Sequence, residues 1–236
     1  MRTIIAYVKF SGLNYVRQHR YLRELVAVII FQIFFRGFLY DTEPGPGIWL
    51  IFSVFAIVLN VMTTPSVFFQ EKGNTLYFLI GKPGGRKYFF ISRIVLIVLI
   101  DSLWLGFFIL LYGLRYLSLD YFLGLPLHVF PVFVILLLST VLISLVYTYR
   151  PHLSWLLFLL VIFGGIVNKP AVFPMHGILE GYKLLVFLLP PFQELSFLSV
   201  SLDFLSLRGG FLLVALLQIF LLYRWSLRGI MQKDFV

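Results

Sequence analysis

The sequence predicts an all-α integral membrane protein with six transmembrane helices, and its composition and apolar runs lead to this fold class. Of the 236 residues, 61% are hydrophobic and 12% are charged, and the mean hydropathy is +0.98. Soluble domains are about 45–50% apolar and about 25% charged, so this chain has too few charges to cover a soluble core. Several apolar runs approach the ~20 residues that a spanning helix needs. Six spans leave no room for a soluble catalytic domain, so residues 1–236 are expected to form a single transmembrane domain.

Residues 1–20 are predicted to form an amphipathic helix that lies on the membrane surface. Apolar side chains at roughly helical spacing alternate there with the basic residues Arg2, Lys9, Arg17 and Arg20. This pattern is typical of a helix that binds an anionic membrane surface. The alternative is a simple charged tail.

Six apolar runs follow, and we interpret each of them as one span. Their ranges are Leu25–Tyr40 (which can be extended back to Tyr21), Ile48–Phe69, Tyr88–Gly113, Val129–Tyr149, Leu153–Val167 and Phe211–Trp225. The fifth and sixth runs are short for a span, and the ends of the first are ambiguous.

The basic residues determine the predicted orientation. With both termini in the cytosol, most of the 19 Lys and Arg residues fall in the inner segments, as the positive-inside rule requires. The expected location is therefore the cytoplasmic (inner) membrane, with a multi-pass topology. The net charge of +9 is explained by these inner segments, so no nucleic-acid partner is expected.

The inner loop, residues 70–87, is predicted to contain a short helix. The run Thr75–Ile80 is apolar, and Asn74 or Thr75 can accept hydrogen bonds from its first free N–H groups. Gly81 and Pro83 are expected to end it after about two turns. Such a helix is too short to span, so it is expected to lie at the cytosolic face.

The outer segment, residues 169–208, is predicted to contain two helices that do not span. Ile178–Leu189 is too short to cross and is expected to be interfacial or re-entrant. After Pro190 and Pro191, apolar and polar residues separate onto two faces at three- and four-residue steps. The apolar face has Leu195, Leu198, Leu202 and Leu205, and the polar face has Ser199, Asp203 and Ser206. This pattern predicts an amphipathic helix on the outer surface.

The sequence lacks the common motifs for catalysis and for metal binding. It has no cysteine, so thiolate chemistry is excluded. Gly81-Lys82-Pro83 has the lysine of a phosphate-binding loop but lacks its other glycine and the hydroxyl residue. The four histidines lie far apart in the sequence. We therefore expect no catalytic residue, no metal site and no cofactor in this chain.

Asp101 is the one acid deep in a predicted span, and no second acid, His or Ser is expected at its depth. An intramembrane acid is costly and usually faces protein or water. Asp101 either lines or gates a transport path, or it is a packed acid hydrogen-bonded to Asn60, Thr63 or Thr64. Asn60 is a second candidate for the path, and its alternative role is an interhelical hydrogen bond.

The inner loop resembles that of the ABC-2 family of permeases. The resemblance is carried by Gln70-Glu71-Lys72-Gly73-Asn74-Thr75-Leu76, then Pro83, Arg86 and Arg93 before an apolar span. In that family an acidic residue, Gly-Thr-Leu, a Pro and basic residues form the loop between the second and third spans. Here Asn74 stands between the Gly and the Thr. The basic amphipathic N-terminal helix, six spans and a broken outer segment before the last span also fit the family.

The resemblance implies that this chain is the permease subunit of an ATP-driven exporter. A separate ATPase subunit would bind ATP and Mg and would dock on a coupling helix in the inner loop. The residues implied in this contact are Glu71, Gly73, Thr75, Leu76, Leu79, Pro83 and Arg86. A second permease chain, in a homodimer or heterodimer, and membrane lipid are the other partners. The substrate class stays open between lipid, glycan, peptide, haem and drug.

Two other functions remain open from the residues alone. One is a non-catalytic membrane assembly or anchoring protein. The other is an intramembrane enzyme, which would need a polar constellation around Asp101.

Overall fold

The computed structural model describes residues 2–35, 45–68, 78–149, 151–172 and 178–232. These residues form helices with no strand among them, which confirms the all-α fold class. Four of the helices are long and apolar enough to cross a membrane, and these are α4 (Ile48–Phe68), α6 (Gly85–Tyr116), α7 (Leu119–Tyr149) and α11 (Leu207–Gln232). The chain therefore has the architecture of a transmembrane protein.

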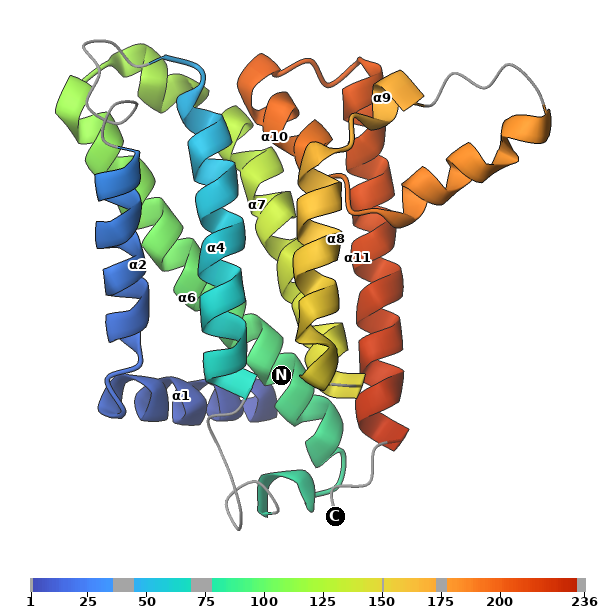
Figure 1. The fold of residues 1–236 in the computed structure, drawn as a ribbon. Coiled ribbons are helices and arrows are strands. Elements are labelled where there is room, and N and C mark those ends of the chain that lie inside the picture. The colour runs from blue at the N-terminus through green and yellow to red at the C-terminus, as the bar shows by residue number, and fades with distance from the viewer. Residues whose placement is uncertain (1, 36–44, 69–77, 150, 173–177, 233–236) are drawn as a thin grey trace.

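Two shorter helices stand beside these four in the bundle (Figure 1). They are α2 (Tyr21–Phe34), with 14 residues, and α8 (Ser154–Ile166), with 13 residues. Helix α1 (Arg2–Arg17) lies crosswise over one end of the bundle, and α11 ends there as well (Figure 1). We call this the α1 end and the opposite one the α10 end.

Helix α1 has one face toward the bundle and one away from it. Its buried residues are Tyr7, Ser11 and Tyr15, which are spaced four residues apart, so they lie along one stripe of the helix. The basic residues Arg2 and Lys9 are exposed. The amphipathic pattern read from the sequence thus corresponds to a helix that packs its inner stripe on α6.

Helix α7 begins well before Val129, where the sequence analysis placed the start of its span. Two features favour a helix from Leu119. Asp120 lies in the first turn, where a negative charge interacts well with the helix dipole, and the Ser118 hydroxyl accepts from the Tyr121 N–H at 3.4 Å. The first turns cross the α10 end before the helix turns into the bundle (Figure 1). Pro126 and Pro131 lie inside the helix near this bend, and each removes a backbone hydrogen bond.

The segment before α11 differs most from its prediction. It contains α9 (Lys169–Val172), a 3₁₀ helix η2 (Ile178–Leu188) and α10 (Phe192–Ser201). The prediction that Leu195 to Leu205 form one surface helix is wrong. Leu195, Leu198 and Ser199 are all fully buried because α10 packs between α7, α4 and α11. The helix ends where Leu202 takes a left-handed conformation, and Leu205 is completely exposed.

Aromatic residues form the core that holds α2 to the long helices. The ring of Phe31 lies 4.8 Å from that of Phe55, and Phe55 lies 4.9 Å from Phe108. These centroid distances are in the range where aromatic pairs attract beyond simple burial. Helix α2 is therefore an integral part of the bundle.

Candidate functional site

The segment from Phe78 to Gly84 is fixed to the α1 end of the bundle. Leu79 and Ile80 are buried against Tyr7 of α1 and Phe89 of α6. The Tyr7 hydroxyl donates a hydrogen bond to the Leu79 carbonyl oxygen at 2.8 Å. Burial raises the pKa of Tyr7, so its hydroxyl stays protonated and remains a donor. The segment is thus tied to two helices rather than suspended as a loop.

Two glycines allow the segment to turn tightly into α6. A Cβ atom at Gly85 would lie 2.4 Å from the Leu79 carbonyl oxygen, which is closer than real Cβ contacts allow. Gly84 has a φ of 68°, a left-handed conformation that glycine adopts without strain. The predicted stop at Gly81 and Pro83 is thus followed by a glycine pair that the sequence analysis did not use.

The outward side of the segment carries an apolar and basic patch. Phe78 is 66% exposed, and the Lys82 ammonium lies 4.5 Å from the centroid of its ring, a cation–π contact. Pro83 is exposed beside them. We call Phe78, Lys82 and Pro83 the Phe78 patch. The segment that carries it extends beyond α1 (Figure 1).

The structure places the predicted coupling residues in three different settings. Leu79 faces inward, Pro83 belongs to the Phe78 patch, and the Arg86 guanidinium donates to the Met231 carbonyl oxygen at 2.9 Å. Arg86 therefore ties the start of α6 to the end of α11. The other predicted contacts lie outside the described residues, and these are Glu71, Gly73, Thr75 and Leu76.

Asp101 is fully buried, and a second acid lies close to it. The Thr63 hydroxyl donates to the Glu24 carboxylate at 3.2 Å and also lies beside the Asp101 carboxyl. Glu24 is itself fully buried. The expectation that Asp101 has no second acid at its depth is therefore wrong. Of the three neighbours predicted for Asp101, Thr63 lies beside it.

Tyr15 of α1 completes this buried group. Its ring is 4% exposed, and its hydroxyl lies near Glu24; burial, together with the negative charge of Glu24, raises the pKa of Tyr15. We call Tyr15, Glu24, Thr63 and Asp101 the four-helix polar cluster, because they come from α1, α2, α4 and α6. Neither carboxylate oxygen of Asp101 makes a hydrogen bond to the described residues, and the same holds for Oε2 of Glu24.

Glu24 was missed because it precedes the apolar run that begins at Leu25. It follows Arg20 and Arg23 and looks like part of a charged inner segment. One feature of the sequence could have indicated that Glu24 is buried. Glu24, Ala27, Val28 and Phe31 are the buried residues of α2, and their spacing is that of a single helix face. A charged residue on the stripe that faces the core indicates burial.

Asn60 bridges α4 and α7 and has both of its polar groups in use. Its amide nitrogen donates to the Leu136 carbonyl oxygen at 2.9 Å. Its amide oxygen accepts from Thr64 at 3.2 Å and from Thr140 at 2.8 Å. This arrangement is that of an interhelical hydrogen-bond residue rather than one with groups open to a path.

The α10 end holds a buried ion pair that the sequence analysis did not predict. The Lys169 ammonium lies 3.0 Å from the Glu194 carboxylate, and both side chains are at most 2% exposed. The backbone N–H of Lys169 also donates to Glu194 at 2.9 Å. Burial lowers the pKa of Lys169, and the charge of Glu194 opposes this shift. The pair joins the start of α9 to α10.

The chemistry of these groups is limited. No group of three or more potential metal ligands occurs in the part of the chain that the structure describes. Two buried carboxyls beside one hydroxyl can share a proton or brace the helices that carry them.

Comparison with known proteins gives no relative, because no family model, no curated protein and no solved structure matches the chain.

Proposed function

We propose that this chain is the membrane subunit of an ABC-2-type exporter whose ATP is hydrolysed by a separate subunit. In this proposal α2, α4, α6, α7, α8 and α11 are the six spans, and the α1 end lies in the cytosol. Six spans are few for a closed pathway, so two such chains, or this chain and a second permease, would pair. The substrate is left open at this point.

The anchored segment that carries the Phe78 patch is the observation on which the proposal depends. An ATPase that changes shape can move a membrane protein only through a segment that is rigidly attached to the helix bundle. Leu79 and Ile80 are buried on the bundle, while Phe78 is exposed beyond it. An aromatic ring with an adjacent ammonium group is suited to a groove with an acidic rim.

The position of this segment supports transmission of the ATPase's motion into two spans, α6 and α11. It leads directly into α6 through Gly84 and Gly85, and residues 69–77 connect it to the end of α4. Arg86 extends the connection to the end of α11. A displacement of the Phe78 patch would therefore be transmitted first to α6 and then to α11.

The charges at the α1 end support its placement in the cytosol. Exposed basic side chains occur there on α1, before and within the first turn of α6, and near the end of α11; these are Arg2, Lys9, Arg17, Lys82, Lys87, Arg224 and Arg228. Basic residues favour the cytosolic side of a membrane protein. The α10 end has fewer exposed bases, among them Arg115 and Arg208.

A charge reversal on the Phe78 patch tests the proposal. We expect Phe78→Asp to abolish co-purification of the ATPase subunit without reducing the amount of chain in the membrane, because Phe78 is exposed. Leu205→Asp is the matched control, since Leu205 is fully exposed at the α10 end. Retention of the ATPase by Phe78→Asp would show that the Phe78 patch is not part of the ATPase contact. Loss with both variants would point to a general effect of the added charge.

A further inference from the structure

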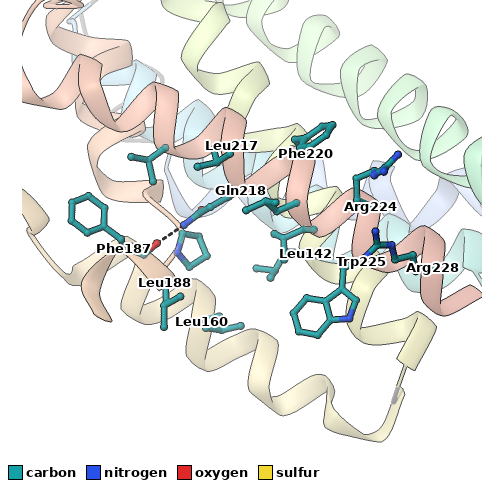
Figure 2. Close-up of a pocket in the computed structure, with 14 residues that line it drawn as sticks. Leu142, Leu160, Phe187, Leu188, Leu217, Gln218, Phe220, Arg224, Trp225 and Arg228 are labelled. Atoms are coloured by element: carbon teal, nitrogen blue, oxygen red, sulfur yellow. Dashed lines mark hydrogen bonds between the residues drawn. The ribbon is translucent and has the colours of Figure 1, made fainter. Parts of the chain in front are cut away.

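A long groove runs between α8 and α11, on the part of the bundle away from the four-helix polar cluster. Its volume is about 880 Å³. Its walls are largely leucine and aromatic side chains, including Leu142, Leu160, Leu217, Phe220 and Leu221. Figure 2 shows four of them, Leu142, Leu160, Leu217 and Phe220. The groove is thus an apolar surface within the depth of the membrane.

At one end, the groove is bordered by the end of η2 and the turn that follows it. The Gln218 side-chain amide donates to the Phe187 carbonyl oxygen at 2.7 Å (Figure 2) and to that of Leu189 at 3.4 Å. These bonds fix the turn against the middle of α11. Phe187 and Leu188 at the end of η2, and Pro190 after it, line the groove.

The other end of the groove is basic. Arg224 and Arg228 line it, with Trp225 beside them (Figure 2). The two arginines are four residues apart, so they lie on the same face of α11. Both are exposed, and neither forms an ion pair with the described residues. No acid is among the described residues that line the groove.

The length of the groove corresponds to one leaflet. The α11 residues that line the groove run from Val214 to Arg228, which is about 21 Å along an α-helix. The hydrocarbon core of a bilayer is about 30 Å thick. A groove that has its arginines and a tryptophan at the interface thus ends near the middle of the membrane.

We propose that this groove binds one anionic phospholipid from the leaflet on the α1 side. The phosphate is held by Arg224 and Arg228, whose guanidinium groups suit phosphate oxygens. One acyl chain lies along Leu217, Phe220 and Leu221, toward the middle of the membrane. A second copy of the chain is a poorer occupant, because the groove offers two arginines and no acid to a partner that carries the same net positive charge. This site does not depend on the proposed transport function.

Native mass spectrometry of the chain in mild detergent tests the headgroup contact. After delipidation, phosphatidylglycerol or phosphatidylcholine is added back to the wild type and to the Arg224→Gln/Arg228→Gln variant. We expect the wild type to bind one phosphatidylglycerol with clear preference over phosphatidylcholine. The double variant should bind it about 25-fold more weakly, at about fivefold for each arginine. Arg115→Gln/Arg208→Gln removes the same charge at the α10 end and should bind as the wild type does.

A second variant tests the acyl-chain contact separately. Leu221→Trp fills the groove from an exposed position and leaves both arginines in place. We expect it to lose the bound phosphatidylglycerol, while Leu213→Trp, at an exposed position of α11 that does not line the groove, should retain it. Equal binding by the wild type and both groove variants would overturn the proposal. A lipid-free dimer that Leu221→Trp dissociates would also overturn it and would assign the groove to a second copy.

Discussion

The Tyr7 hydroxyl donates a hydrogen bond to the Leu79 carbonyl oxygen at 2.8 Å, across 72 residues of sequence. This bond joins the helix that lies over the α1 end to the segment that carries the Phe78 patch. Both partners are buried, and Phe89 of α6 packs against them. The bond therefore makes α1 part of the support beneath the proposed ATPase contact.

Tyr7→Phe is expected to loosen the segment without unfolding the bundle. It removes one buried hydrogen bond, which contributes about 0.5–1.5 kcal/mol, and leaves the ring in place. Amide hydrogen exchange of residues 78–84 should become several-fold faster. Tyr88→Phe is the control, because no hydrogen bond of the Tyr88 hydroxyl is found among the described residues. Equal exchange in Tyr7→Phe and the wild type would show that packing alone holds the segment.

Gly85→Ala is expected to destabilise the same junction. Its Cβ would lie 2.4 Å from the Leu79 carbonyl oxygen and 2.8 Å from that of Ile80, and forced overpacking costs about 1–3 kcal/mol. Gly106→Ala in the same helix is the matched control, because nothing lies within 4 Å of its Cβ. That change should be neutral or stabilising by up to ~1 kcal/mol. Thermal unfolding in detergent measures both, and equal melting temperatures would contradict the close approach at Gly85.

Thr63→Val is expected to destabilise the four-helix polar cluster. It keeps the shape of the side chain but removes the hydroxyl that lies between Glu24 and Asp101. Leaving a buried acceptor unpaired costs about 1–3 kcal/mol. Thr63→Ser, which keeps the hydroxyl, should retain most of the stability. Thermal unfolding followed by tryptophan fluorescence compares them, and a Val variant as stable as the Ser variant would show that the hydroxyl contributes nothing.

Glu194→Gln is expected to have the largest effect on stability among these changes. It leaves the Lys169 ammonium buried without its counter-charge, and breaking a buried pair costs about 3–5 kcal/mol. Glu180→Gln is the control, because its pair with Lys183 is partly exposed and such pairs contribute about 0–1 kcal/mol. Denaturant unfolding in detergent measures the difference. Similar losses in the two variants would mean that the Lys169–Glu194 pair is not buried in solution.

Much of the helix pattern could be predicted because it depends on local composition. Continuous apolar runs predicted the positions of α4, α6 and the later part of α7, and prolines predicted that the segment before α11 is broken. The early start of α7 was missed because Asp120, Gly124 and Pro126 interrupt the apolar residues before Val129. A proline at the bend of a helix resembles a proline in a loop when only the sequence is available.

The pairs that build the sites could not be predicted in the same way. Glu24 meets Thr63, and Lys169 meets Glu194, only because distant helices come together. The burial of Ser199 likewise depends on α7 and α4, which surround α10. Sequence spacing indicates which residues share a face of one helix, but it does not indicate what that face contacts.

The central claim is that this chain works with a separate ATPase, and one purification tests it most directly. The tagged, unmodified chain is isolated in mild detergent, and the proteins that remain bound are identified by mass spectrometry. We expect a P-loop ATPase to co-purify with the chain in a stoichiometric amount. It should be lost from Phe78→Asp and retained by Leu205→Asp. A chain that purifies alone, or with partners that include no ATPase, would contradict it and would favour an anchoring role.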